Sequence, residues 1–364
     1  MFWRNLISGN IVLVFLIFSG IYTYDRSIQF ADYSPLVYGA LLLSRQIGML
    51  CANLFFNKVW NSIGVFKYFI LSVVMYCQFG ILFVFDANYL WLRLISYAVI
   101  GFSVNSISLI VMGLLRSINA NQFFVSITSL SSVFALLLTA FSSENMLVVL
   151  FMSISSLIPY LFMSNASELT PTVGINNQLS YKSFVICYRY YGKFFWNLLL
   201  FYVCDYLFGT YLVSKILSYH IDVKDVKLYV AGVTGVRFLL NYPFRYMMSG
   251  INPVRKMIIV STMVIISCIC ELLSNNMIGS YLFIVHAITG LFSSLYLFPM
   301  EYFERYRLQR HKAIPTIMVS NVISSIAYLI AIPIGVMSIS MSQRIGTTYV
   351  LMLLHFICIL NTVF

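Results

Sequence analysis

The chain has 364 residues, of which 61% are hydrophobic and only 9% are charged, and its formal net charge is +11. A soluble domain of this length could not cover its surface with so few charges, because that surface would form one continuous apolar patch. The composition excludes a soluble protein and predicts an all-α, polytopic membrane protein. The surplus of Lys and Arg is typical of cytoplasmic loops, and no basic domain large enough to bind nucleic acid is present.

Windows of about 20 apolar residues predict transmembrane helices, and twelve such windows follow one another along the chain. Ten or eleven spans also fit, because several windows are short or crowded. The twelve windows are 8–24, 35–56, 68–85, 90–113, 122–141, 146–163, 194–214, 226–248, 257–274, 278–299, 314–335 and 347–364.

The distribution of Lys and Arg predicts the orientation of these spans. With the N-terminus in the cytoplasm, the cytoplasmic turns hold 14 Lys and Arg residues and the outer turns hold 5. Positive charges collect in the cytoplasmic loops of membrane proteins. We therefore expect a multi-pass protein of the cell inner membrane with both termini in the cytoplasm.

The longest polar connection divides the chain into two halves of six helices. We predict an N-terminal half at 1–163, a cytoplasmic linker at 164–193 and a C-terminal half at 194–364. The first part of the linker has the composition of a flexible segment. Its second part, YKSFVICYRYYGKFF, fits either a segment at the inner membrane surface or the start of the seventh helix.

A basic turn recurs in the two halves, which indicates an internal repeat. The first copy follows the apolar run that carries Arg45, and the second follows the run that carries Arg237, 192 residues later. Lys58, Gly64 and Lys67 of the first turn are followed 187, 186 and 188 residues later by Arg245, Gly250 and Arg255.

Two six-helix halves, a long linker and this repeated basic turn resemble the major facilitator superfamily. In that family the turn after the second helix reads Gly-x-x-x-Asp-Arg-x-Gly, and here the stretch 53–58 reads NLFFNK, with Gly64 displaced and Lys67 as a late base. The run LWLRLISYAVIGFS, with Arg93, is similar to the family's Arg-containing fourth helix, although Tyr97 stands where Gly is usual. The Gly-Pro antiporter signature of the fifth helix is absent.

The resemblance implies a monomeric secondary active transporter that works by alternating access in the lipid bilayer. We expect a small organic substrate, proton coupling and export rather than import. The turn formed by Asn57, Lys58, Gly64 and Lys67 would be the conformational gate. The alternative is a surface-glycan assembly protein, either an O-antigen polymerase or a lipid-glycan flippase, and a transport-inactive sensor of the same fold is a third reading.

Charged residues inside apolar helices are site candidates, because a charge at bilayer depth costs about 2.5–3.5 kcal/mol on insertion scales. Asp205 is the first candidate, either as a proton- or cation-binding acid or in an ion pair with Arg237. Arg237 itself is expected to pair structurally. The seventh helix, which carries Asp205, lines the central cavity in proteins that this chain resembles.

The other candidates each have two readings. Arg93 fits an anchor for an anionic group of the substrate or an arginine that reaches the outer interface. Arg45 lies deep in its helix, where a substrate-binding role is favoured. His286 fits a hydrogen-bonded core residue or a proton relay, and Glu271 is expected to reach the outer interface. We expect no enzyme activity, cofactor or metal, because no nucleotide-binding loop, metal-ligand cluster or nucleophile elbow occurs in the sequence.

Overall fold

The computed structural model describes residues 15, 19–20, 34–85, 89–117, 124–141, 181–274, 279–295 and 316–364. The regular elements of this described part are α-helices, without a strand. The chain divides into two compact units, Met1–Asn176 and Asn177–Phe364. The predicted all-α class is confirmed, while the predicted spans at 8–24 and 146–163 lie outside the described residues, apart from Phe15, Ser19 and Gly20.

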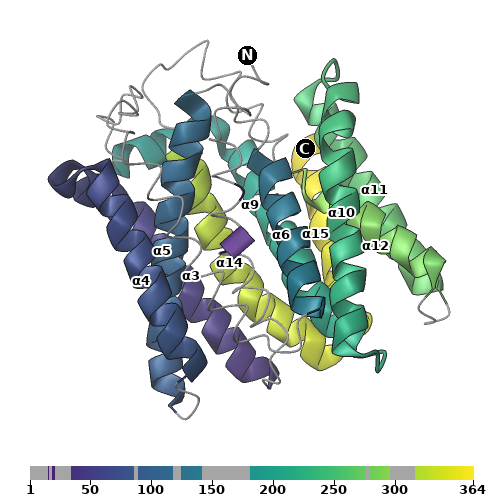
Figure 1. The fold of residues 1–364 in the computed structure, drawn as a ribbon. Helices are drawn as coiled ribbons and strands as arrows, with labels where there is room; N and C mark the ends of the chain where they lie inside the picture. The colour runs from purple at the N-terminus through teal and green to yellow at the C-terminus, as the bar shows by residue number, and fades with distance from the viewer. Residues whose placement is uncertain are drawn as a thin grey trace. The chain divides into compact units, whose positions relative to one another are not determined.

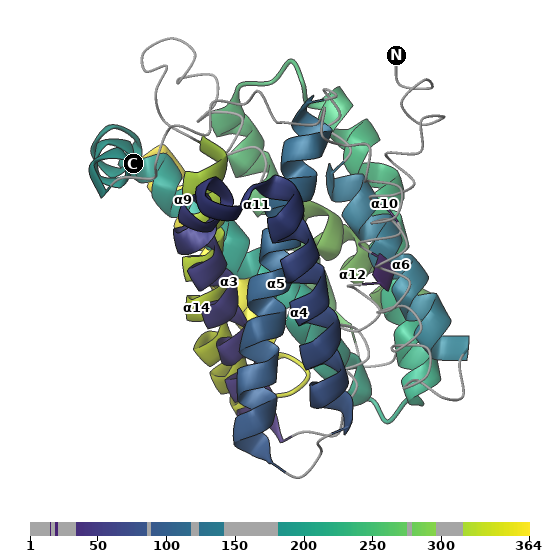
Figure 2. The same cartoon turned by 60° about the vertical axis from the view of Figure 1, so that its left-hand side comes forward.

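In the first unit, three of the four described helices pack together, and Figure 2 shows α3, α4 and α5 side by side. Gly64 separates α3 from α4 with a φ of +82°, a conformation that glycine adopts without a steric penalty. The four helices are α3 (Pro35–Ile63), α4 (Val65–Phe85), α5 (Leu90–Ser117) and α6 (Phe124–Phe141).

The break at Gly64 corrects the predicted turn after the second helix. We expected a polar turn that begins at Asn57 and Lys58, but both residues lie within α3, which continues to Ile63. Lys67 is exposed and lies in the first turn of α4. The helix continues because the stretch 57–63 contains neither glycine nor proline, and polar residues alone do not end a helix.

Glycines bring α3 and α5 into backbone contact. A Cβ atom added at Gly48 would collide with the carbonyl oxygen of Ala98, and one added at Gly101 would collide with that of Arg45. Small residues allow such close approach between helices in a membrane. The Asn105 side chain donates a hydrogen bond of 2.9 Å to the Met49 carbonyl across the same contact, which fixes the register of the two helices.

The second unit contains six described helices, and Figure 1 shows α10, α11 and α12 side by side. Helix α9 contacts α10, α12, α14 and α15, so it is the central helix of this unit. The six helices are α9 (Tyr181–Leu217), α10 (Val223–Met247), α11 (Pro253–Leu273), α12 (Ser280–Ser293), α14 (Thr316–Met341) and α15 (Gly346–Val363).

Helix ends in this unit follow local chemistry. Asn252 caps α11 by accepting a 2.9 Å hydrogen bond from the Val254 amide, and Pro253 occupies the first helical position, where its missing N–H costs nothing. Helix α9 begins at Tyr181, inside the predicted linker. The aromatic and basic segment after residue 180 is therefore the start of the seventh predicted helix, which is one of its two predicted readings.

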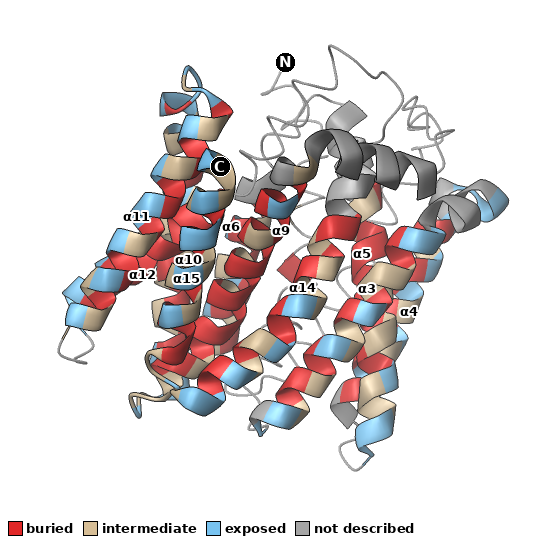
Figure 3. Cartoon of the chain, turned by 180° about the vertical axis from the view of Figure 1, so that it is seen from behind, coloured by how far each residue is buried: buried red, intermediate tan, exposed pale blue. Residues whose placement is uncertain are grey.

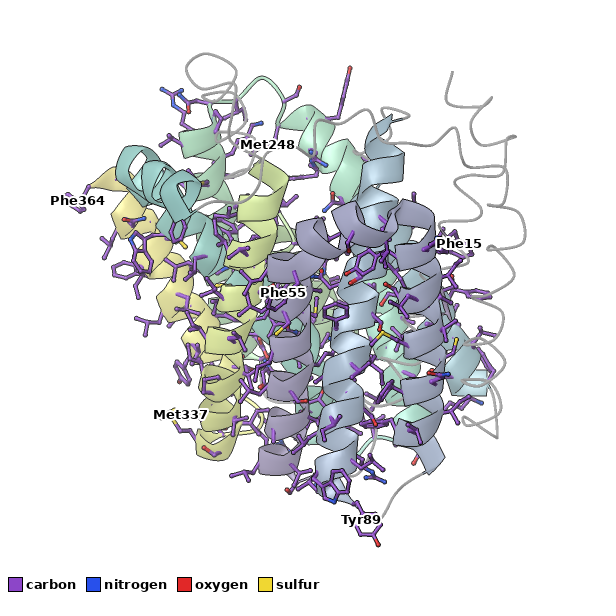
Figure 4. All side chains as sticks on the ribbon, turned by 90° about the vertical axis from the view of Figure 1, so that its left-hand side faces the viewer. Phe15, Phe55, Tyr89, Met248, Met337 and Phe364 are labelled. Atoms are coloured by element: carbon purple, nitrogen blue, oxygen red, sulfur yellow. The ribbon has the colours of Figure 1, made fainter. Side chains whose placement is uncertain are left out.

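Five described helices are long and apolar enough to cross a membrane, namely the spans Leu90–Ile110, Phe195–Leu217, Pro253–Leu273, Val322–Met341 and Gly346–Val363. Together with the composition, they show a multi-pass membrane protein. Large apolar side chains are exposed on helices of both units, as Phe55 on α3 and Met337 on α14 illustrate with 52% and 66% exposure (Figure 4). Such surface is suited to lipid.

Helix α9 differs from the other spans in how little of it is exposed. Its membrane window is 78% buried, against 33% for α15, and Figure 3 shows it mostly in the colour of buried residues. Polar side chains on α9 are therefore shielded from lipid and contact protein groups instead.

Candidate functional site

Two acid–base clusters lie on helix α9, ten residues apart. The first is an ion pair between Asp205 of α9 and Arg237 of α10, with 3.2 Å between Oδ1 of the aspartate and Nη1 of the arginine. The pairing that the sequence predicted is confirmed. The side chains are 13% and 22% exposed, so the pair is only partly enclosed by protein.

Aromatic rings from two helices lie beside this pair. Tyr206 of α9 stacks on Tyr328 of α14, with 4.6 Å between ring centroids and 29° between ring planes. Tyr202 meets the same ring edge-on at 6.2 Å. Such offset and edge-on geometries are favourable because aromatic faces are electron-rich and their edges are electron-poor. Asp205 therefore lies between Tyr202 and Tyr206 in α9, and both of these rings contact Tyr328 of α14.

The contact between α9 and α14 is fixed further along both helices. The hydroxyl of Tyr211 donates a 3.0 Å hydrogen bond to the Ile332 carbonyl, next to Pro333 inside α14. A Cβ atom at Gly335 would collide with the Tyr211 ring, so the glycine provides the space that the ring occupies. This contact holds α14, and Tyr328 with it, against α9.

The second cluster is centred on Glu271 of α11 and joins five helices. Its Oε1 atom forms an ion pair with Lys215 of α9 and lies 3.2 Å from Nε2 of His286 on α12. Its Oε2 atom accepts a 3.1 Å hydrogen bond from Thr348 of α15, and Thr348 accepts a 2.6 Å hydrogen bond from Lys215. Tyr229 of α10 lies 2.8 Å from Nδ1 of His286.

One assignment of protons satisfies this whole network. The carboxylate of Glu271 is an acceptor, so Nε2 of His286 carries the proton that it donates. Nδ1 of His286 then accepts a hydrogen bond from the hydroxyl of Tyr229. With neutral His286, the positive charge of Lys215 and the negative charge of Glu271 cancel. The Glu271 network is thus closed and neutral, as buried charges require.

A cation–aromatic contact lies in the turns next to this network. The guanidinium carbon of Arg344 is 4.8 Å from the ring centroid of Tyr219, and its Nη2 atom donates a 3.3 Å hydrogen bond to the Ser218 carbonyl. Burial and the nearby Glu271 charge raise the pKa of Tyr219, while Arg344 lowers it. The helix ends around Glu271 are therefore tied together on the loop side as well.

The Glu271 network corrects two sequence predictions. We expected Glu271 at the outer interface and counted Lys215 among the outer turn charges, but each side chain is only 6% exposed and they pair with each other. His286 is the hydrogen-bonded core residue of its two predicted readings. A usable sequence signal existed, because Glu271 is the only acid in α11 and His286 the only histidine in α12.

In the first unit, the two predicted arginines lie on either side of an aromatic pair. The guanidinium carbons of Arg45 and Arg93 are each 5.9 Å from a ring centroid, that of Tyr97 and Phe83 respectively, and these two rings are 5.3 Å apart. Cations within about 6 Å of a ring centroid are attracted to its face. Tyr97 stands where the fourth helix of the major facilitator superfamily usually has glycine. Its ring is only 1% exposed and contacts Arg45.

Metal binding has no support in the described part of the chain, where His, Cys, Asp and Glu do not gather in groups of three or more that could hold an ion. The two acid–base clusters therefore offer proton, hydrogen-bond and ion-pair chemistry. The structure brings Asp205 and Arg237 together, as predicted, and places His286 in the separate Glu271 network.

No protein-family model and no curated protein matches the sequence. Solved structures do match over nearly the whole chain. The nucleoside transporter NupG aligns with a TM-score of 0.69 at 12% identity, covering 99% of this chain and 98% of its own. A bacterial homologue of the iron transporter ferroportin, in an outward-facing state, aligns with a TM-score of 0.65 at 14% identity and covers 98% of both chains.

The major facilitator superfamily transporter FucP, in its outward conformation, aligns with a TM-score of 0.59 at 12% identity over 97% of both chains. At these identities the likeness concerns the fold. The chain has the fold of major facilitator superfamily transporters, as its repeated basic turn and its Arg93 run indicated.

Proposed function

We propose that this protein is a secondary active transporter of a small organic molecule, driven by the proton gradient and working by alternating access. The observation that carries the proposal is the Asp205–Arg237 pair, a partly exposed acid and base on two helices of a transporter fold. Charges at bilayer depth are costly and are retained in membrane proteins chiefly for function. Similar solved structures are transporters, including one for nucleosides and one related to an iron transporter.

The proposed coupling follows from simple electrostatics. While Asp205 is ionised, its attraction to Arg237 holds α9 and α10 together at this level. A proton taken up by Asp205 removes that attraction, so the two helices can separate and Arg237 can bind another acceptor. Protonation would thus favour one orientation of the transporter and deprotonation the other, as alternating access requires.

We also propose the remaining details of the transport reaction. The direction is export, and the protein works as a monomer in the cell inner membrane with both termini in the cytoplasm. Asn57, Lys58, Gly64 and Lys67, at the junction of α3 and α4, form the conformational gate. A reporter fused after Asn176 should report a cytoplasmic position, and an external signal there would overturn this topology.

The first experiment identifies the substrate by untargeted mass spectrometry of cells and medium from a deletion strain and its parent. A compound that accumulates inside the deletion strain and is missing from its medium supports export. The strain is then complemented with Asp205→Asn, which should restore membrane-inserted protein but not export. Normal export by this variant would remove Asp205 from the mechanism.

Asp222→Asn is the matched control, because it makes the same chemical change at an exposed carboxylate just before α10 that caps no helix amide. It should restore export fully. Surface-glycan ladders are run from the same cultures to test the alternative role in glycan assembly. An unchanged metabolite profile with altered ladders would contradict the transport proposal and favour a role in glycan assembly.

A further inference from the structure

Two basic side chains meet the same oxygen atom of Glu271. Lys215 forms an ion pair with Oε1, and Nε2 of His286 lies 3.2 Å from that atom. Lys215 and Glu271 are each 6% exposed and His286 is 1% exposed, so water screens their charges much less than it would at a surface. One carboxylate balances one cation, and Lys215 already supplies it.

A second cation arises when His286 takes up a proton. Nε2 already donates to Glu271, so the added proton binds Nδ1, which accepts a 2.8 Å hydrogen bond from the hydroxyl of Tyr229. Nδ1 then becomes a donor, and the hydroxyl has to rotate to accept from it. The group of Lys215, Glu271 and His286 acquires a net positive charge in the protein interior, where an uncompensated charge is costly.

The neighbouring titratable groups do not offset this added charge. Cys268 of α11, Tyr281 of α12 and Tyr219 in the turn after α9 are neutral below about pH 8. Arg344, whose guanidinium lies over the Tyr219 ring, is itself positive. Asp225, in the first turn of α10, is exposed, so water screens its charge.

We propose that the Glu271 network is a pH-sensitive lock, in which protonation of His286 loosens the ends of the helices that meet there. Separation of these ends admits water, which screens the second cation. The loosened form therefore binds the proton more readily than the closed form, so a fall in pH favours it. An unperturbed histidine titrates near about pH 6.5, so the transition should fall between about pH 7 and pH 5. This lock goes beyond the proposed transport reaction, because neither Asp205 nor Arg237 takes part in it.

Helix α15 should respond most strongly to the loss of the lock. Thr348, in its first turn, accepts a hydrogen bond from Lys215 and donates one to Glu271. The other end of α15 is held independently, because Thr362 accepts a 2.8 Å hydrogen bond from Asn197 of α9. Acid should thus free the start of α15 and leave its end in place.

The test is hydrogen–deuterium exchange of the purified full chain in detergent at pH 8 and pH 5.5, corrected for the intrinsic pH dependence of exchange. Amides of the segment 349–353 should exchange at least about tenfold faster at pH 5.5, whereas those of 358–363 should change less than about twofold. Equal rates at the two pH values would overturn the inference, and so would an equal increase at both ends of α15.

Histidine variants then assign the response. His286→Gln cannot titrate and retains a side-chain amide that can donate to Glu271, so it should abolish the pH dependence. His220→Asn and His355→Gln are the matched controls and should retain it. His220 is exposed in the turn after α9, and His355 is buried on α15, with Nδ1 3.3 Å from Ser261. Persistence of the pH dependence in His286→Gln, or its loss in either control, would overturn the inference.

Lys215→Met provides a second and opposite prediction. In this variant Glu271 lacks its lysine counter-charge at pH 8, and protonated His286 supplies one at pH 5.5. Acid should therefore slow exchange at the start of α15 in the variant and accelerate it in the wild type. The same direction in both proteins would contradict the competition of two cations for one carboxylate.

Asp205→Asn separates this inference from the proposed function. The variant should lose gradient-driven transport and keep the pH response of α15, because Asp205 is outside the Glu271 network. A normal pH response in a wild-type protein that transports nothing would overturn the proposed function alone. Transport by a wild-type protein without the pH response would overturn the lock alone.

Discussion

Helix α9 carries two acid–base pairs of similar chemistry in different surroundings. Asp205–Arg237 is partly exposed, and Tyr206, the next residue of α9, stacks on Tyr328 of α14. Lys215–Glu271, about 15 Å further along the helix, is closed by His286 and Thr348. An intramembrane charge alone therefore does not identify a functional site, because its role depends on the groups that surround it.

A change of protonation would affect the two pairs differently. Changing the protonation of Glu271 would disturb contacts with three other helices at once. Changing that of Asp205 disturbs one contact with one helix. We therefore expect the Glu271 network to hold the helix ends of the second unit together, and the Asp205–Arg237 pair to change during transport. The predictions below test this contrast.

The largest effect is expected for Glu271→Ala, which leaves Lys215 buried without its counter-charge. Removal of one partner of a buried pair costs about 3–5 kcal/mol. We expect little folded protein by size-exclusion chromatography of detergent extracts, and a much lower melting temperature in what remains. The double variant Lys215→Met with Glu271→Leu should recover much of the yield, since apolar replacement of a buried pair is often neutral. A wild-type melting temperature for Glu271→Ala would contradict the stabilising role of the Glu271 network.

The double variant Asp205→Asn with Arg237→Gln should show the opposite profile. Replacing both partners of a mostly buried ion pair by neutral residues is often nearly neutral for stability, so the melting temperature should change little. Gradient-driven transport of the substrate identified by metabolite profiling should fall at least tenfold, because no acid remains to take up the proton. The double variant Lys215→Met with Glu271→Leu is the comparison. If it folds normally and its transport falls equally, the two pairs do not differ in their role in transport.

Thr348→Val tests whether the network depends on complete hydrogen bonding. The valine has almost the same shape but can neither accept from Lys215 nor donate to Glu271. Unsatisfied buried groups cost about 1–3 kcal/mol, so the melting temperature should drop clearly while transport by the folded protein persists. Thr347→Val is the control at a neighbouring buried threonine, and an equal loss in both variants would show that the effect is not specific to the network.

The smallest effect is expected for Tyr229→Phe, which removes only the hydrogen bond to Nδ1 of His286. Hydrogen bonds between membrane helices contribute about 0.6 kcal/mol on average, so the melting temperature should decrease slightly. A larger drop than that of Thr348→Val would mean that His286, and not Glu271, is the centre of the network.

The sequence predicted the Asp205–Arg237 pair and missed the Lys215–Glu271 pair, for a physical reason. Asp205 and Arg237 are lone charges well inside apolar runs, where their cost is obvious from the sequence. Glu271 and Lys215 lie near the ends of their helices. The local sequence at a helix end is the same whether the side chain reaches water or turns towards the protein interior. Their burial depends on which helix ends meet, and hydrophobic periodicity does not encode this.

The junction after the second helix was also only partly predictable. Gly64 was recognised as part of a turn, since glycine is the residue that adopts a positive φ most easily. Asn57 and Lys58 were placed in the same turn because they are polar, yet α3 continues through them to Ile63. Similarly, the glycine contact between α3 and α5 at Gly48 and Gly101 could not be foreseen from residues that are 53 positions apart.

The sequence by itself determined the class of this protein. A chain that is 61% hydrophobic with 9% charged residues must place its helices in lipid, since its backbone and apolar side chains have no other favourable environment. Only the tertiary structure decided the state of each charge. The cost of a buried charge depends on partners from other helices, so Lys215, Glu271, Asp205 and Arg237 acquire their roles when those helices pack.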